Sequence, residues 1–181
     1  MEDSIAARHV ALIGLSGVGK SSVGPLVAEA LRLPFLDTDR EVEKAAGVPI
    51  HRIFREQGEA AFRALEAEQV QRALEAPPAV LSLGGGAVLD PDSREFLWLR
   101  ATVVWLRARP EVLAQRLLAA PGAEERPLLA AGNPEARLRV LLEERESVYS
   151  RAHVTVDAEA GSPTQVAAIL LAALGQLETE V

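Results

Sequence analysis

The sequence predicts an α/β protein built around a five-stranded, mainly parallel sheet. Short apolar runs alternate with helical patterns along all 181 residues, as they do in repeated β-α units. A glycine-rich loop joins the first apolar run to the first helical pattern. Aromatic residues make up only 4% of the chain, whereas alanine, leucine, arginine and glutamate dominate, which favours many helices and an aliphatic core. A chain of this length is expected to form one domain, residues 1–181.

Five short apolar runs predict the strands, at residues 9–13, 34–37, 79–83, 101–106 and 153–157. Helical patterns fall between and after these runs, at residues 20–32, 40–46, 50–57, 59–75, 92–98, 110–119, 134–150 and 163–177. In open sheets of this class, ligands bind beyond the carboxyl ends of the strands. The candidate ligand contacts are therefore the residues just after strands, at 14–21, 37–39 and 84–86.

The charge balance excludes a general affinity for polyanions. The chain has 19 basic and 26 acidic residues, which gives a formal net charge of −7. Such a surface has no electrostatic basis for binding nucleic acid or an anionic membrane. Any site for an anion must therefore be a local cluster of cations. Because there is no cysteine, the fold does not depend on disulfides or thiolate metal sites.

The sequence also predicts a soluble, cytoplasmic protein. The first nine residues carry mixed charge and lack the apolar centre of a signal peptide. The longest apolar candidate, residues 166–174, is too short to span a membrane. No additional interface element is apparent, so a monomer is the expected state.

The glycine-rich loop, residues 14–21, has the pattern G-x-x-x-x-G-K-S between the first predicted strand and helix. Its glycines allow successive backbone N–H groups to converge on phosphate oxygens, and the following helix adds the positive end of its dipole. Lys20 can then reach the β and γ phosphates, while the Ser21 hydroxyl can bind Mg²⁺. The alternative is an ordinary glycine-rich turn. The full pattern in this context predicts nucleotide binding.

Two carboxylates, Asp37 and Asp39, follow the second predicted strand. Their spacing would place both on the same side of an extended chain, so that one could serve a metal and the other a substrate. The structural alternative is that Thr38 or Asp39 caps the next helix. The two interpretations are compatible.

Two predicted helices carry charges on their apolar faces. Glu66 lies among inward-facing residues, and Arg63 is three residues away, close enough to pair with it across one helical turn. Arg145 stands where the stripe of the helix after Pro134 would place a leucine. The structural alternatives are a salt bridge at the core edge for the first pair and a snorkelling side chain for Arg145. The functional alternative is a receptor for a carboxylate or phosphate.

Two further segments are candidates. Gly84, Gly85 and Gly86 remove three side chains at the end of a strand, where the backbone could approach a ligand closely, although a flexible turn is the simpler explanation. Residues 119–133 are rich in helix breakers at both ends and contain Arg126. We expect this segment to form a lid, since ordinary connectors of that length are uncommon.

Taken together, these segments resemble the shikimate kinases, small P-loop kinases of the nucleoside monophosphate kinase fold group. The resemblance extends over nearly the whole chain and rests on GLSGVGKSS at 14–22, LDTD at 36–39, GEAAFRALE at 58–66, LSLGGGAV at 81–88, ERPLL at 125–129, RESVY at 145–149 and VDAEAGSP at 156–163. It implies a three-layer α/β/α P-loop kinase fold with a lid. It also implies transfer of the γ-phosphoryl group of ATP to the 3-hydroxyl of shikimate, with Mg²⁺.

The resemblance further implies a role for each matching residue. Asp39 would bind the ring hydroxyls and orient or deprotonate the nucleophile, Arg63 and Arg145 would hold the carboxylate, and Glu66 would support Arg63. Asp37 would join Ser21 at the metal through water. The ATP contacts would be Gly17, Val18, Gly19, Lys20, Ser21, Ser22, Arg116, Arg126 and Pro163, and the remaining substrate contacts would be Gly84, Gly85 and Gly86. We expect the side chains of Lys20, Asp39, Arg63 and Arg145 to surround one common cavity.

Two other functions compete with this one. A non-catalytic metabolite sensor of the same fold would be expected to lose Asp39 or Arg126 and to follow a DNA-binding segment, whereas both residues are present and about nine residues precede the first predicted strand. The second competing function is that of a kinase for a sugar acid such as gluconate. Residues 84–86 with Arg63 and Arg145 favour shikimate, by resemblance more than by physical argument.

Overall fold

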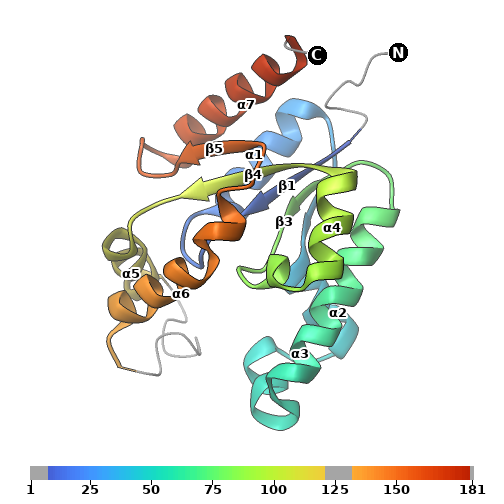
Figure 1. The fold of residues 1–181 in the computed structure, drawn as a ribbon, viewed down its shortest axis with the longest axis vertical. Helices are drawn as coiled ribbons and strands as arrows, with labels where there is room; N and C mark the ends of the chain where they lie inside the picture. The colour runs from blue at the N-terminus through green and yellow to red at the C-terminus, as the bar shows by residue number, and fades with distance from the viewer. Residues whose placement is uncertain (1–7, 121–131, 180–181) are drawn as a thin grey trace.

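A computed structural model describes residues 8–120 and 132–179 of the chain. It contains a five-stranded sheet with strand order β2-β3-β1-β4-β5, in which every neighbouring pair is parallel (Figure 1). The strands are β1 (His9–Ile13), β2 (Phe35–Asp37), β3 (Val80–Ser82), β4 (Ala101–Arg107) and β5 (Val154–Asp157). The predicted α/β class and all five predicted strands are confirmed, with bounds that differ by at most a residue at either end.

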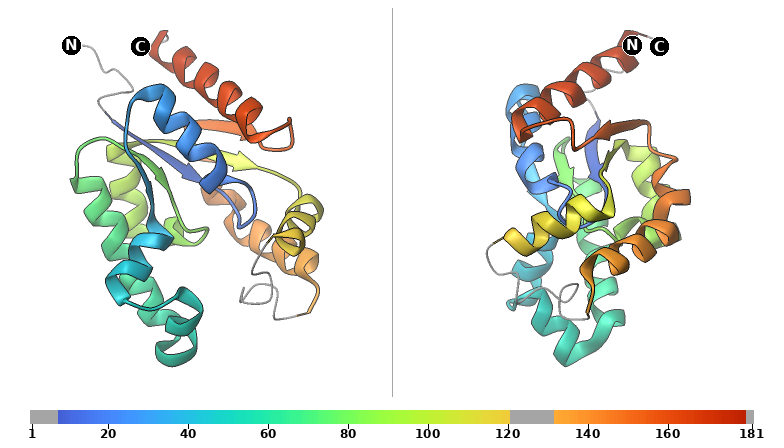
Figure 2. Two further views of the ribbon diagram at one scale, coloured as in Figure 1. Left: turned by 180° about the vertical axis from the view of Figure 1, so that it is seen from behind. Right: turned by 90° about the vertical axis from the view of Figure 1, so that its left-hand side faces the viewer.

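The helices are α1 (Lys20–Leu31), α2 (Thr38–Ala46), α3 (Ile50–Glu75), α4 (Pro91–Arg100), α5 (Pro110–Ala119), α6 (Pro134–Tyr149) and α7 (Pro163–Thr179). Figure 2 shows α1 and α7 over one face of the sheet and α4 and α6 over the other. This is the three-layer arrangement that the resemblance implied. Because both faces are covered, all five residues of β1 are buried, and the strand is a continuous apolar run after its first residue.

The helical patterns were also located correctly, with two differences. The predicted helices 50–57 and 59–75 are the two parts of α3, which bends at Gly58, where φ is 83° and ψ is 174°. A left-handed φ of this kind suits glycine, so the residue marks the bend. A short 3-10 helix, η2 (Ala87–Leu89), directly follows the three glycines and was not predicted. Such short turns carry no periodic signal.

Hydrogen bonds from side chains determine where several helices begin. Asn133 accepts from the backbone N–H groups of Glu135 and Ala136 at the start of α6, and Asp90 accepts from Ser93 N at the start of α4. These oxygens satisfy N–H groups that have no partner within the helix. None of the helices within the described residues is long and apolar enough to cross a membrane.

The contact between α1 and β2 generates a stability prediction. Gly24 is a buried residue inside α1, and a Cβ atom there would overlap the Phe35 ring, standing 3.0 Å from Cδ2. Gly24→Ala should therefore lower the free energy of unfolding by about 1–3 kcal/mol, although alanine is the better helix former. Urea denaturation followed by circular dichroism measures the change.

Gly175 provides the matched control, because it also lies inside a helix but a Cβ there would meet nothing within 4 Å. Gly175→Ala should raise stability by about 0.5–1 kcal/mol. Equal stabilisation by both substitutions would contradict the close packing of α1 on Phe35.

Candidate active site

The glycine-rich loop connects β1 to α1 through backbone conformations that favour glycine. The φ angles of Gly14, Gly17 and Gly19 are 140°, 82° and 103°, in the left-handed half of φ space. Gly17 also lies against α5, where a Cβ would stand 2.8 Å from the Leu117 side chain. Helix α1 begins at Lys20, directly after these glycines. The N–H groups of the loop and of the helix N-terminus are therefore close together, as they are in phosphate-binding sites.

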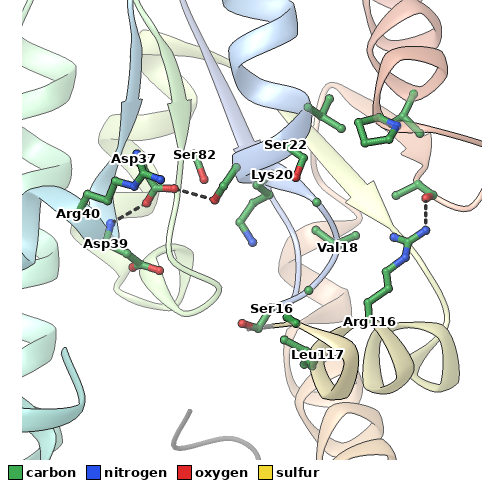
Figure 3. Close-up of a pocket in the computed structure, with 18 of the residues that line it drawn as sticks. Ser16, Val18, Lys20, Ser22, Asp37, Asp39, Arg40, Ser82, Arg116 and Leu117 are labelled. Carbon is green, nitrogen blue, oxygen red and sulfur yellow. Dashed lines mark hydrogen bonds between the residues drawn. The ribbon is translucent and has the colours of Figure 1, made fainter. Parts of the chain in front are cut away.

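A cavity of about 870 Å³ lies beside this loop, beyond the carboxyl ends of β1 and β2. Figure 3 shows Lys20 and Asp39 extending into it from α1 and α2. All the predicted ATP contacts that the structure describes line this cavity, namely Gly17, Val18, Gly19, Lys20, Ser21, Ser22, Arg116 and Pro163. Arg116 also donates to the Ala158 carbonyl at 2.9 Å, which joins α5 to the loop after β5 (Figure 3). Arg126 lies outside the described residues.

Lys20 is one of the basic side chains that line the cavity. Its Nζ donates to the carbonyl oxygens of Gly14 and Leu15, at 2.7 and 3.2 Å. Burial lowers the pKa of Lys20 to about 8, because the charged form loses hydration, and the nearby Asp39 and Asp37 oppose this effect. A bound anion would favour the charged form, so the site is suited to a phosphate group.

Asp37 connects the loop to the start of α2. One of its oxygens accepts from Ser21 Oγ at 2.7 Å, and the other accepts from Asp39 N at 3.1 Å. The residue is therefore the N-cap of α2, so the expected cap by Thr38 or Asp39 was wrong. The expected extended chain across both carboxylates was wrong for the same reason, because the helix already begins at Thr38.

Ser21 and Asp37 provide oxygen ligands of the kind that Mg²⁺ prefers. Their side-chain oxygens lie 2.7 Å apart at the edge of the cavity. Within the ranges that the structure describes, no group of three or more His, Asp or Glu side chains could hold a metal ion alone. One or two protein oxygens completed by phosphate oxygens and water is the usual arrangement for Mg²⁺ at nucleotide sites, and these two residues fit it.

Asp39 lies in the first turn of α2 and faces the cavity (Figure 3). Burial raises the pKa of its carboxyl group, and Asp37 raises it further, whereas Lys20 lowers it. A carboxylate with a raised pKa is a better proton acceptor than an exposed aspartate. Lys20 and Asp39 are thus groups of opposite charge on the wall of one cavity.

The predicted ion pair on α3 is present. Arg63 Nη1 lies 2.6 Å from Glu66 Oε2, and Glu66 is only 3% exposed. Burial raises the pKa of Glu66, although Arg63 opposes the shift. Burial also acts to lower the pKa of Arg63, but Glu66 and Glu59 outweigh it, and the net shift is upward. The pair holds the guanidinium group in a defined direction.

Residues 84–86, here termed the glycine turn, bring these charges together. A Cβ at Gly84 would overlap Glu66 Oε1 and stand 2.8 Å from Asp39 Oδ1, and one at Gly86 would overlap the Arg63 guanidinium. These two positions require glycine because charged side chains of the protein occupy the space that a Cβ atom would take. A close approach was predicted here, but to a ligand, and the groups that approach in this structure are side chains of the protein.

Arg145 approaches the same turn from α6. It is 9% exposed, and its Nη1 donates to the Gly85 carbonyl at 2.8 Å. Its side chain does not snorkel to the surface, which excludes the structural alternative for this residue. Its Nε atom is buried without a hydrogen-bond partner among the described residues.

The expectation that four side chains surround one cavity was wrong for this conformation. Lys20 and Asp39 line the large cavity, Arg63 lines a separate hollow of about 390 Å³, and Arg145 lines neither of them. The reason is that Arg63 is held against Glu66 and Arg145 against the glycine turn. All four nevertheless interact electrostatically, since Arg145 lowers the pKa of Lys20 and Arg63 lowers that of Asp39.

Comparison with known proteins identifies the family. The family model described as Shikimate kinase matches residues 16–175. The chain belongs to the shikimate kinase family. The shikimate kinase of Thermus thermophilus is 46% identical over 153 residues, which are 84% of this chain and 82% of the relative. A solved shikimate kinase from Acinetobacter baumannii, in complex with shikimate, has a TM-score of 0.86 and 36% identity, over 94% of this chain and 92% of that one.

Family membership distinguishes this chain from kinases that share only its architecture. A solved gluconokinase from Sinorhizobium meliloti has a TM-score of 0.64 and 23% identity, over 97% of this chain and 95% of that one. At this identity the similarity shows the fold alone. Every motif on which the resemblance rested lies within the matched residues, apart from the first two residues of the glycine-rich loop.

Part of the cavity wall was not predicted from the sequence. Arg40, Glu43, Ile50 and His51 line the large cavity from α2 and the start of α3. Glu43 could have been predicted from helical spacing, because it lies one turn after Asp39 and so on the same side of α2. For Ile50 and His51 there was no local signal, because only the packing of α3 beside α2 brings them to the cavity.

The lowered pKa of Lys20 predicts a pH dependence of stability. Between the folded value of about 8 and the unfolded value near 10.5, the unfolded chain binds more protons at this residue. Lys20 therefore makes the free energy of unfolding rise with pH over this window, and its destabilising effect is fully present below pH 8.

Lys20→Met removes this group, so the variant should be more stable than wild type at pH 7 and should lose most of this advantage by pH 10, just below the unfolded pKa near 10.5. Urea denaturation of both proteins at pH 7, 8, 9 and 10 measures the difference, in which the titration of all other groups cancels. A difference that does not change with pH would exclude a lowered pKa for Lys20.

Proposed function

We propose that this protein transfers the γ-phosphoryl group of ATP to the 3-hydroxyl of shikimate, giving shikimate 3-phosphate and ADP. This reaction is a step of chorismate and aromatic amino-acid biosynthesis. The chain belongs to the shikimate kinase family, and the observation that carries the proposal is the glycine turn. Gly85 lies near the Gly14 carbonyl of the phosphate-binding loop, and two carboxylates and two guanidinium groups approach the turn. That combination matches an acceptor with hydroxyls at one end and a carboxylate at the other.

The glycine-rich loop is proposed to hold the nucleotide. Gly17, Val18, Gly19, Ser21 and Ser22 line the cavity around Lys20, which would stabilise the transferring phosphoryl group. Arg116 and Pro163, on the far wall, would contact the base side of ATP. Transfer requires in-line positioning and positive charge around the equatorial oxygens, and these residues can provide both.

The glycine turn and its neighbours are proposed to hold shikimate. Asp39 would bind the ring hydroxyls and either orient or deprotonate the 3-hydroxyl. Arg63, supported by Glu66, and Arg145 would bind the carboxylate, because a guanidinium fork matches a carboxylate in geometry and charge. Gly84, Gly85 and Gly86 would contact the ring through their backbone. Arg63 must then turn toward the large cavity when substrate binds, whereas Arg145 can keep its bond to the Gly85 carbonyl and offer its other N–H groups to the carboxylate.

Mg²⁺ is proposed to bind through Ser21 directly and through Asp37 by way of water. The ion would neutralise charge on the phosphate oxygens during transfer. The contribution of the chain is to place Ser21 Oγ and Asp37 Oδ2 side by side at the edge of the phosphate region. The roles of Arg126 and of residues 119–133 as a lid remain predictions, as do a monomeric state and a cytoplasmic location.

Release of ADP from MgATP tests the reaction directly. The protein should release ADP when shikimate is present and much less when it is absent or replaced by gluconate. A coupled pyruvate kinase and lactate dehydrogenase assay gives the rate, and mass spectrometry of the product identifies the phosphorylated acid. Stimulation by gluconate alone would reject the proposed substrate.

Asp39→Asn should lower turnover by at least about two orders of magnitude, a typical effect of losing a proton acceptor. The substitution keeps the shape of the side chain while removing its charge, so steady-state kinetics with saturating substrates isolates the chemical role. Asp92→Asn is the matched control, because Asp92 also lies in the first turn of a helix but is exposed on α4. Wild-type turnover in the Asp39 variant would remove this role.

Arg145→Leu should weaken shikimate binding by about 2–5 kcal/mol, the usual cost of losing one partner of a desolvated charge pair. Leucine suits the apolar stripe of α6, so the variant should remain folded. Arg139→Leu makes the same change at an exposed position of the same helix and should leave affinity within about twofold. Isothermal titration calorimetry compares the three proteins. Equal affinity in all of them would contradict a carboxylate-binding role for Arg145.

A further inference from the structure

Tyr149, the last residue of α6, connects this helix to the glycine turn. Its side chain is fully buried, with 0% exposed, and its O–H donates to the Gly85 carbonyl at 2.5 Å. The ring packs against Trp105 of β4, with 5.7 Å between ring centroids. Burial raises the pKa of Tyr149, so the hydroxyl keeps its proton at neutral pH and remains a donor.

The same carbonyl oxygen accepts a second hydrogen bond from Arg145, at 2.8 Å. Arg145 and Tyr149 are four residues apart and so lie on one face of α6. The Nε atom of Arg145 is buried without a hydrogen-bond partner among the described residues, so the bond to Gly85 has a large part in orienting the guanidinium. A shift of the Gly85 carbonyl would therefore change the direction of the Arg145 guanidinium.

Gly85 also lies close to the glycine-rich loop. A Cβ on Gly85 would stand 3.4 Å from the Gly14 carbonyl, which accepts from Lys20 Nζ at 2.7 Å. The loop itself is held by β1, which pairs with both β3 and β4, and by the start of α1. A change at Tyr149 would therefore affect Arg145 more than the nucleotide side.

We propose that Tyr149 is a positioning residue for the acceptor site: its hydroxyl holds the Gly85 carbonyl in the place that directs the Arg145 guanidinium. This inference deepens the proposed function and rests on it. Tyr149 touches neither substrate in this proposal and acts only through Gly85 and Arg145. It accounts for a buried hydroxyl on a stripe of α6 that is apolar apart from Arg145, where phenylalanine would fill the same space without a donor.

Tyr149→Phe tests the proposal, because phenylalanine keeps the packing against Trp105 and removes only the hydroxyl. We expect the KM for shikimate to rise about five- to tenfold, the scale of one lost hydrogen bond, while kcat and the KM for MgATP stay within about twofold. Direct titration with shikimate should give the same loss of affinity. A KM for shikimate within about twofold of wild type, or an equal rise in both KM values, overturns the proposal.

Leu138→Val is the control for a merely structural effect. Leu138 is fully buried on α6, three turns before Tyr149, and the substitution weakens the packing of the same helix without changing a hydrogen bond. It should lower the midpoint of thermal unfolding without raising the KM for shikimate selectively. The same selective rise in this control would overturn the positioning role.

Gly85→Ala provides a second variant should Tyr149→Phe fail to fold. Its Cβ would stand 3.1 Å from Arg145 Nη1, so it displaces the guanidinium while the Tyr149 hydroxyl remains. The folded variant should also show a raised KM for shikimate, and an unchanged value overturns the proposal.

Amide hydrogen exchange separates this inference from the proposed function. In ligand-free Tyr149→Phe, the amides of residues 84–87 should exchange at least about tenfold faster than in wild type, and unchanged exchange overturns the tether. Failure of the wild-type protein to release ADP with shikimate would instead reject the proposed function, while the exchange rates still decide whether Tyr149 holds the turn.

Discussion

The site depends on how closely charged side chains approach the glycine turn. Glu66 and Asp39 reach Gly84, Arg63 reaches Gly86, and Arg145 reaches Gly85, each into space that a β-carbon would otherwise take. In this way charges from α2, α3 and α6 meet at the carboxyl end of β3. Opposite charges at such short range, partly removed from water, interact more strongly than they would on the surface. The charged groups can come this close only because three consecutive residues of the turn have no side chain.

The ionisation of these groups follows from the same burial. Burial raises the pKa of Asp39 and Glu66 and lowers that of Lys20, and a neighbour of opposite sign opposes the shift of each group. The protein carries a net charge of −7, yet it gathers Arg63 and Arg145 at the glycine turn, with Lys20 near enough for Arg145 to lower its pKa. A local cluster of cations within an acidic protein can select small anions without attracting nucleic acid.

Much of this arrangement could be predicted from residue order. The alternation of apolar runs with helical patterns located the strands and helices, because the two periodicities differ and both faces of a parallel sheet are covered. The rule that ligands bind beyond the carboxyl ends of strands selected the glycine-rich loop, Asp37 with Asp39, and the glycine turn. The pairing of Arg63 with Glu66 followed from their spacing of three residues on one helix.

The sequence by itself determined the fold class, the family motifs and the residue types of the candidate site, since these depend on local spacing. Only the tertiary structure decided that Asp37 caps α2, that Arg63 and Arg145 face the glycine turn instead of one shared cavity, and that Tyr149 shares an acceptor with Arg145. The reason is physical. Gly85 and Tyr149 are separated by 64 residues, and no local pattern encodes which carbonyl a buried hydroxyl will meet once α6 has packed on the sheet.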